Sequence, residues 1–277
     1  MIDLNHGERY LEPLLLKSVI EEKIAKKLEL LKNQVMLNYG SNSNLILFFS
    51  ALSVKFLHEQ KRKLRVLLDV PNYFFSIKQL TEWKIEQILV GRDEHMEFCL
   101  EDFIRNMKMN KPDVVLLTTP NNPTGKPIAD EQIKRILREL PSDCIILFDR
   151  SLVNTLPEIS SKTLLHDYSD KKIVVLHSFS KSHSLSEERI GFLATNNSEI
   201  AIELYNKRDL PHNLHALKKC LSVIDNEKIV KTKKRIIRNC NLALKDYFKD
   251  KKDFIYYDSH SNFALIKLRE GFKSTKL

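Results

Sequence analysis

Short apolar runs that alternate with stretches of helical periodicity constrain the fold of this chain more than any other feature of its sequence. The runs are rich in Val, Ile and Leu, which is typical of strands buried on both faces of a sheet. They predict strands at residues 35–39, 64–70, 85–90, 113–118, 144–148, 173–176 and 189–194. Because these strands alternate with helices, we expect an α/β fold of three layers, with helices flanking a mostly parallel sheet.

Helices are expected between the strands, where apolar residues recur at helical spacing. The first, at residues 14–31, would present one apolar face to the core. That face would consist of Leu15, Val19, Ile24, Leu28 and Leu31. Further helices are predicted at residues 45–57, 72–81, 100–107 and 130–140.

The sequence changes character after residue 206. Residues 214–247 are rich in Lys and Arg and predict one or two long helices, with a break near residues 225–226. Apolar runs at 254–257 and 263–268 are expected to form a small sheet. The expected domains are an N-terminal arm (1–13), a large α/β domain (14–205), and a linking helix with an abbreviated α+β domain (206–277).

Charge and cysteine content bound the partners of the chain. The net charge is +9, from 45 Lys and Arg against 36 Asp and Glu, which would suit an anionic partner. The basic residues are spread along the chain, most densely at 228–251, without interleaved aromatic residues. We interpret them as a solvated surface and expect no nucleic-acid partner.

The four cysteines do not show the spacing of a metal site, so we expect no metal. Cys144 lies beside an apolar run and is expected to be a buried free thiol. No apolar run approaches the length of a membrane span, and residues 1–10 have no apolar core of a signal peptide. We therefore expect a cytoplasmic protein without a membrane partner.

Polar clusters follow the predicted strands at their carboxyl ends. In parallel sheets, ligands bind beyond these ends, so the clusters are expected to converge on one site. They lie at residues 40–43, 71–73, 121–125, 149 and 178–189.

Lys181 lies just beyond the buried strand at 173–176. Partial desolvation there would lower the pKa of its amine and allow it to attack a carbonyl. Ser178, Ser180 and Arg189 supply the hydroxyls and the planar cation that suit a phosphate. An aldehyde-reactive lysine beside a phosphate site indicates pyridoxal 5′-phosphate (PLP), although a solvated strand exit remains the alternative.

The turn at residues 40–43 is the second candidate for anion binding. It contains Ser41 and Asn42, and it precedes a helix whose free amides would attract a phosphate. A plain helix cap explains the same residues equally well. His177 and His183 flank the lysine, and His212 follows later, but loop or structural roles are favoured for all three.

Two motifs resemble those of the fold-type I PLP enzymes of the aminotransferase class I/II superfamily. One runs from Ser178-Phe179-Ser180-Lys181 to Arg189-Ile190-Gly191, and the other is Pro120-Asn121-Asn122-Pro123-Thr124-Gly125. The resemblance extends over about residues 9–268 and is strongest to histidinol-phosphate aminotransferases and threonine-phosphate decarboxylases.

The resemblance implies a role for each matching residue. Lys181 would form the internal aldimine and shuttle a proton, and Asp149 would pair with the pyridinium nitrogen. Asn122 would hydrogen-bond the phenolic oxygen, and Tyr73 would stack on the ring. The phosphate would be held by Ser178, Ser180, Arg189 and the turn with Gly40, Ser41 and Asn42. Tyr10 resembles a tyrosine that reaches the partner's phosphate, which implies a homodimer with shared sites.

The chain also departs from the family pattern. Leu152 replaces a tyrosine that donates to the phenolic oxygen, and Glu187 replaces a glycine. The N-terminal arm is shorter than usual. No match is found for the C-terminal arginine that holds the substrate carboxylate, since Arg269 does not fit the motif.

Three hypotheses follow. The first is a PLP enzyme acting on a small amino donor and acceptor, an amino acid or amino-phosphate, with transamination favoured over decarboxylation or other α-carbon chemistry. The second is a non-catalytic homologue that binds PLP or a partner protein. The third is an unrelated α/β binding protein.

Overall fold

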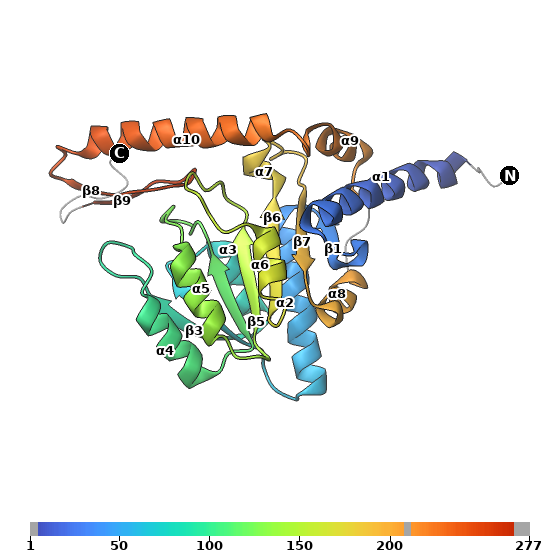
Figure 1. Ribbon diagram of the computed structural model, residues 1–277, viewed down its shortest axis with the longest axis horizontal. Helices are drawn as coiled ribbons and strands as arrows, with labels where there is room; N and C mark the ends of the chain where they lie inside the picture. Colours follow the sequence, from blue (N-terminus) through green and yellow to red (C-terminus); the bar gives the residue numbers. More distant parts are fainter. Residues whose placement is uncertain (1–4, 208–211, 269–277) are drawn as a thin grey trace.

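The computed structural model describes residues 5–207 and 212–268, with side chains from residue 11 onward. Its centre is a seven-stranded sheet of order β1-β7-β6-β5-β4-β2-β3 (Figure 1). The strands are β1 (Val35–Asn38), β2 (Arg65–Val70), β3 (Glu86–Gly91), β4 (Val114–Thr118), β5 (Ile145–Arg150), β6 (Lys172–Ser178) and β7 (Gly191–Thr195). Only β7 runs antiparallel to its neighbours, β1 and β6. The predicted α/β fold with a mostly parallel sheet is confirmed.

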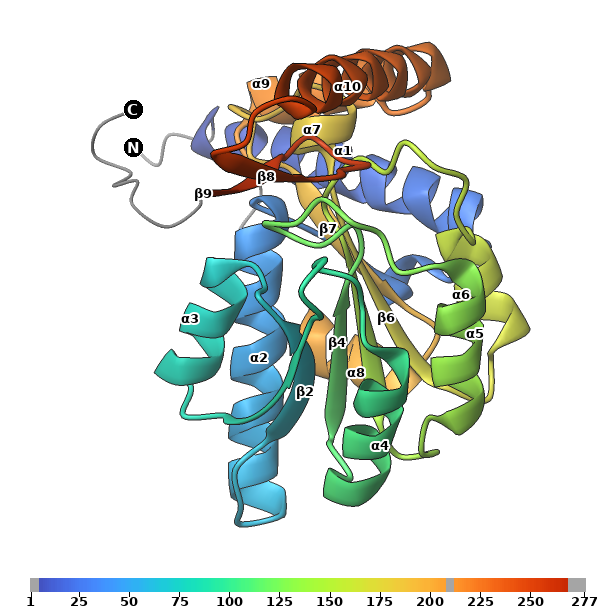
Figure 2. The ribbon, with the colours of Figure 1, turned by 90° about the vertical axis from the view of Figure 1, so that its left-hand side faces the viewer.

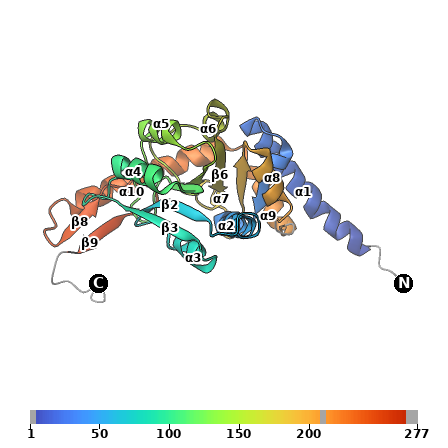
Figure 3. The same ribbon diagram turned by 90° about the horizontal axis from the view of Figure 1, so that it is seen from below.

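Helices cover both faces of this sheet (Figure 3). The helices of one layer are α1 (Asn5–Leu28), α4 (Leu100–Asn110), α5 (Asp130–Glu139), α6 (Ser161–Asp167) and α9 (Leu214–Val223). Those of the other layer are α2 (Gly40–Glu59), α3 (Phe74–Glu82) and α8 (Ser198–Tyr205). Side chains alternate between the two cores along each strand, so that Leu67 packs in one and Val66 and Leu68 in the other. The short helices α6 and α8 were not predicted.

The first helix differs from its prediction in both extent and orientation. α1 begins at Asn5, so most of the expected arm is helical, and it extends beyond the sheet in Figure 1. Leu15, Val19 and Leu31 are exposed, whereas the buried face comprises Lys17, Ile20, Glu21, Ile24 and Ala25. A pattern of apolar residues alone missed this face because two of its positions are charged.

The C-terminal part follows its prediction closely. α9 ends at Val223 and α10 (Glu227–Phe248) begins after a break at Asp225 and Asn226, where Asp225 is ion-paired with Lys23 and Lys27 of α1. The strands β8 (Phe254–Tyr257) and β9 (Leu265–Leu268) form the small antiparallel sheet. This hairpin lies between α10 and the carboxyl ends of the large sheet (Figure 2).

The connection between β8 and β9 is bound to the large sheet's loops. His260 donates its backbone N–H to the Gly125 carbonyl at 2.9 Å, and Thr155 donates to the His260 carbonyl at 2.9 Å. Gly125 has φ +69°, and a Cβ there would lie 2.0 Å from Ser259 Oγ. Glycine at 125 is therefore what allows this connection to approach and to bring Phe263 to the strand ends.

No helix within residues 5–207 and 212–268 is long and apolar enough to cross a membrane.

Candidate functional site

A cavity of about 220 Å³ lies at the carboxyl ends of the strands. It is lined by side chains from all five polar clusters that the sequence singled out. The lining residues are Ser41, Asn42, Tyr73, Thr118, Asn122, Asp149, Ser151, Leu152, Ser178, Ser180, Lys181, Ser186, Arg189 and Phe263. Every candidate residue therefore lies here except Tyr10, whose side chain falls outside the described residues.

Lys181 lies in α7 (Phe179–Ser182), a single helical turn that directly follows β6. Ser178 caps this turn by accepting the backbone N–H of Ser180 at 3.2 Å, and Ser182 donates its hydroxyl to the Ser178 carbonyl at 3.1 Å. Lys181 as a whole residue is exposed, and it lines the cavity; the expected partial desolvation of its amine stays a prediction. The lysine lies beyond the strand end rather than within its apolar surroundings.

Asp149 is the charged group buried deepest in the cavity wall, with 4% of its surface exposed. Its Oδ1 accepts hydrogen bonds from Ser151 N at 3.0 Å and Ser151 Oγ at 2.5 Å. Burial raises the pKa of this carboxyl, and the two Ser151 hydrogen bonds offset part of the rise. A cationic ring nitrogen placed beside Asp149 would stabilise the charged carboxylate, so the residue fits a pyridinium partner.

Several donors converge at the start of α2. Gly40, Ser41 and Asn42 form its first turn, where backbone N–H groups lack helical partners and attract anions. A Cβ on Gly40 would lie 3.1 Å from Arg189 Nη2, so the glycine lets the guanidinium lie against this turn. Together with Ser178 and Ser180, this arrangement fits a phosphate.

The turns after β2 and β4 complete the cavity with Tyr73 and Asn122. Tyr73 donates its hydroxyl to Asn42 Oδ1 at 3.2 Å, which connects its turn to the start of α2. Leu152, at the position of the family's tyrosine, lines the same cavity and offers no hydrogen-bond donor.

Four lining residues were not singled out from the sequence: Thr118, Ser151, Ser186 and Phe263. Ser151 could have been found, because a serine two residues after an aspartate often donates to that carboxylate in a turn. Phe263 carried no such signal, since it reaches the cavity only through the β8–β9 connection.

The three histidines do not line this cavity. The His177 ring stacks on Phe192, and its Nε2 is 2.7 Å from Ser161 Oγ; burial lowers the pKa of His177 to about 3. His183 is hydrogen-bonded to Ser182, and His212 stacks on Tyr39. The described contacts are those of structural residues.

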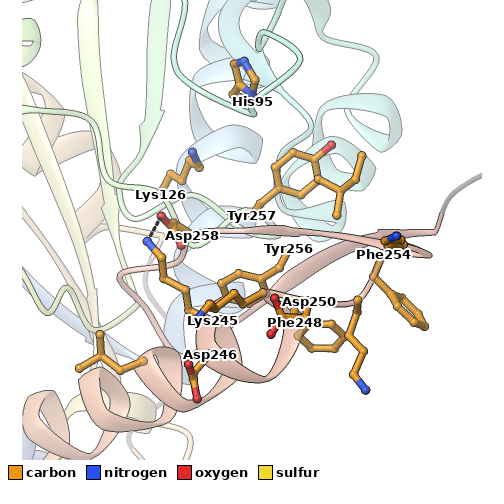
Figure 4. A pocket seen from close by; sticks show the side chains of 15 residues that line it. His95, Lys126, Lys245, Asp246, Phe248, Asp250, Phe254, Tyr256, Tyr257 and Asp258 are labelled. Carbon is orange, nitrogen blue, oxygen red and sulfur yellow. Dashed lines mark hydrogen bonds and ion pairs between the residues drawn. The ribbon is translucent and has the colours of Figure 1, made fainter.

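A larger cavity, of about 1010 Å³, lies between α10, β8 and the loop after β3 (Figure 4). Lys126, Lys245, Tyr256 and Asp258 are among its lining residues, and Lys245 pairs with Asp258 at 2.7 Å. It contains none of the candidate residues, and its one buried cation, Lys126, is already paired with Glu97. The smaller cavity therefore remains the candidate site.

Comparison with known proteins connects this geometry to a family. A model of the aminotransferase class I and II family matches residues 7–270. Histidinol-phosphate aminotransferase 2 of Haemophilus influenzae is 27% identical over 262 residues, which cover 91% of this chain and 66% of that protein. A histidinol-phosphate aminotransferase of Francisella philomiragia is 24% identical, over 95% of this chain and 71% of the relative. The chain thus spans about two thirds of the length of these curated relatives.

Solved structures share the fold. A histidinol-phosphate aminotransferase of Clostridium acetobutylicum aligns with a TM-score of 0.75 and 20% identity, over 95% of this chain and 73% of that one. L-threonine-O-3-phosphate decarboxylase of Porphyromonas gingivalis aligns with a TM-score of 0.74 and 17% identity, over 97% and 80%. A Sinorhizobium meliloti histidinol-phosphate aminotransferase in complex with pyridoxal 5′-phosphate gives a TM-score of 0.75 and 16% identity, over 93% and 66%.

Proposed function

The chain belongs to the aminotransferase class I and II family, and on this premise we propose that it is a PLP-dependent aminotransferase that acts on an amino acid or an amino-phosphate. One observation carries the proposal: a single cavity contains a lysine, a buried carboxylate and a cluster of phosphate donors. The histidinol-phosphate aminotransferases among its relatives support an amino-phosphate as substrate.

PLP, when bound, supplies an aldehyde that condenses with amines and a ring that withdraws electrons from the substrate Cα. Lys181 would bind this aldehyde through its ε-amine, and the same amine would carry the proton taken from Cα. Asp149 would keep the ring nitrogen protonated, because a carboxylate favours a positive charge beside it. Ser151 orients Asp149 by holding its Oδ1.

The remaining residues would orient the cofactor. Ser178, Ser180, Arg189 and the first turn of α2 would bind the phosphate. Tyr73 would pack on the ring, and Asn122 would donate to the phenolic oxygen. Leu152 leaves Asn122 without the family's second donor, so we expect the electron distribution of bound PLP to differ from that in typical relatives.

The first test is the visible absorption spectrum after incubation with PLP and dialysis, for the wild type and for Lys181→Ala. The wild type should retain the absorption band of PLP bound to Lys181, and borohydride should reduce this C=N bond to a stable covalent link at Lys181. The variant should show neither the band nor the link. A wild type without this band at saturating PLP would refute the proposal and favour a repurposed scaffold.

Decarboxylation is the second candidate, and the structural likeness to the Porphyromonas gingivalis decarboxylase favours it. The same lysine and aspartate would serve both reactions, because the bond broken at Cα decides between them. Product analysis separates the two: transamination yields a keto product and transfers nitrogen to the acceptor, whereas decarboxylation releases CO₂ and leaves an amine.

We further propose a homodimer in which Tyr10 reaches the partner's phosphate. The projecting end of α1 exposes Leu11, Leu14 and Leu15, at 57%, 47% and 64%, which is apolar area that a second copy would cover. The double variant Leu11→Lys/Leu15→Lys should shift the mass measured by light scattering from dimer to monomer. An unchanged mass would refute this interface.

A cytoplasmic location is part of the same proposal. All four cysteines, Cys99, Cys144, Cys220 and Cys240, are free, and unpaired thiols suit a reducing compartment. We likewise propose the division into an N-terminal arm (1–13), a large PLP-binding domain (14–205) and a linking helix with a small C-terminal domain (206–277).

A further inference from the structure

We propose that Asp69 and Arg92 are positioning residues for the cofactor: their buried ion pair aligns the two turns that present Tyr73 and Asn122. This inference rests on the proposed function, because it assigns a role toward bound PLP. Neither residue lines the cavity, and neither was singled out from the sequence.

The ion pair joins the ends of two neighbouring strands. Asp69 lies near the end of β2, and Arg92 directly follows β3. Arg92 Nε is 2.6 Å from Asp69 Oδ2, and the two side chains are 0% and 2% exposed. The guanidinium also donates to the Met96 carbonyl at 3.0 Å. Charges this deeply buried are stable only when paired, so the pair holds both groups in one arrangement.

One arm of the network leads from Asp69 to Tyr73 through Asn72. Asn72 Nδ2 donates to the backbone carbonyl of Asp69 at 3.1 Å and lies 3.4 Å from Oδ1 of the Asp69 carboxylate. Asn72 Oδ1 accepts the backbone N–H of Tyr73 at 2.7 Å and the Thr118 hydroxyl at 2.9 Å. The Asn72 side chain, which bonds to Asp69, therefore also fixes the backbone of Tyr73. The same side chain accepts a hydrogen bond from Thr118, which lines the cavity.

The other arm leads from Asp69 to Asn122 through Asn121. Asn121 Nδ2 is 3.3 Å from Asp69 Oδ2 and 3.0 Å from the Pro71 carbonyl. Asn121 Oδ1 accepts the Thr124 backbone N–H at 3.2 Å and the Thr124 hydroxyl at 2.9 Å, which closes the turn that contains Asn122. Asn121 is fully buried. Oδ2 of Asp69 therefore accepts hydrogen bonds both from Arg92 and from Asn121 in the turn after β4.

The variant Asp69→Asn tests this role, because it removes the charge and leaves an amide of nearly the same shape. Asp113→Asn is its matched control. Asp113 directly precedes β4, at the amino ends of the parallel strands and so at the opposite end from Asp69. It pairs with Arg62 through two contacts of 2.7 Å. It also accepts the backbone N–H of Arg65 at 2.9 Å. Both substitutions break an arginine–carboxylate pair beside β2, but only one of the pairs contacts the cofactor turns.

Three quantities are measured for each protein: the dissociation constant of PLP, the pH midpoint of the lysine-bound PLP absorption band, and the thermal unfolding midpoint without PLP. We expect Asp69→Asn to weaken PLP binding by about tenfold, the scale on which outer partners of a bound group act. We also expect it to raise the spectral midpoint, because a displaced Asn122 stabilises the anionic phenolic oxygen less. Asp113→Asn should lower the unfolding midpoint and leave both PLP quantities unchanged.

Asn72→Ala provides a second variant should Asp69→Asn fail to fold, since it keeps the ion pair and removes only the arm toward Tyr73. It should likewise weaken PLP binding. Equal effects of Asp69→Asn and Asp113→Asn on PLP binding, or a spectral midpoint that neither Asp69→Asn nor Asn72→Ala moves, would overturn the positioning role while leaving the proposed function intact. A wild type without any PLP band would overturn the proposed function and this inference together.

Discussion

Tyr73 and Asn42 are joined by a hydrogen bond of 3.2 Å, although they lie on different elements 31 residues apart. Tyr73 precedes α3, and Asn42 lies in the first turn of α2. The residue proposed to pack on the cofactor ring is therefore held by the turn proposed to bind its phosphate. Ring and phosphate recognition are mechanically linked in this site.

Tyr73→Phe isolates this link, because it keeps the aromatic ring and removes the hydroxyl. We expect the dissociation constant of PLP to rise about 2- to 10-fold, as the loss of a net 0.5–1.5 kcal/mol hydrogen bond predicts. Fluorescence titration with PLP measures it. Tyr247→Phe is the control, since Tyr247 is 63% exposed on α10 and should leave the affinity unchanged. A Tyr73→Phe affinity equal to that of the wild type would show that the hydroxyl contact does not matter for binding.

Local sequence predicted the residues at the strand ends well, because sheet order and direction bring those ends together. Lys181, Asp149 and Asn122 each follow an apolar run that predicts a buried strand. Parallel strands then place them at one edge of the sheet, whatever the order of the strands. The position of the site could therefore be predicted before the strand order was known.

Residues whose position depends on contacts between distant parts of the chain could not be predicted in this way. Phe263 reaches the cavity because Gly125 admits the β8–β9 connection, and Asp69 meets Arg92 only because β2 and β3 pair. The buried face of α1 was misassigned for a related reason: Lys17 and Glu21 are buried there through tertiary contacts that no apolar pattern reveals.

Gly125→Ala should displace the β8–β9 connection. A Cβ at 125 would lie 2.0 Å from Ser259 Oγ, and its φ of +69° disfavours alanine. We expect a loss of about 2–4 kcal/mol in the free energy of unfolding, combining backbone strain with overpacking. Denaturant unfolding measures the loss. Gly91→Ala is the control, because a Cβ there meets nothing within 4 Å, and its effect should stay within about 0.5 kcal/mol. Equal losses at the two glycines would contradict the close approach.

His177 should make the protein sensitive to acid. Burial lowers its pKa to about 3 from an ordinary value of 6.5, so the unfolded chain binds a proton that the folded chain refuses. The contribution of His177 to stability is therefore complete above pH 6.5 and falls as the pH drops toward 3, by about 3 kcal/mol at pH 4.5. His177→Gln should lose less stability than the wild type between pH 6.5 and 4.5 in unfolding measured at each pH. The exposed His95, changed to Gln as a control, should retain the wild-type profile, and a His177→Gln profile as steep as the wild type's would refute the assignment.

Asp149→Asn distinguishes the effect of a buried carboxylate on the stability of the fold from its proposed effect on the bound cofactor. Burial raises the pKa of Asp149 above its ordinary value of 3.8, so the folded protein binds more protons than the unfolded chain above that pH. Without PLP, stability should then decrease as the pH rises from about 3.8 through the folded pKa, and the variant should lack this decrease. Thermal unfolding of the PLP-free proteins at several pH values measures the difference.

With PLP bound, Asp149→Asn should be harmful, because it should reduce the activity of the enzyme. The variant loses a charged partner for the ring nitrogen, and turnover should fall about 10- to 100-fold, the equivalent of the 1.5–3 kcal/mol that hydrogen bonds to charged groups contribute. Ser151→Ala, which keeps the carboxylate and removes one of its hydrogen bonds, should cause a smaller loss. Asp149 would be a purely structural residue if its asparagine variant were less stable than the wild type without PLP and equally active with it. An apoprotein that gains stability while the loaded enzyme loses activity would identify Asp149 as a charge retained for the cofactor at the expense of the fold.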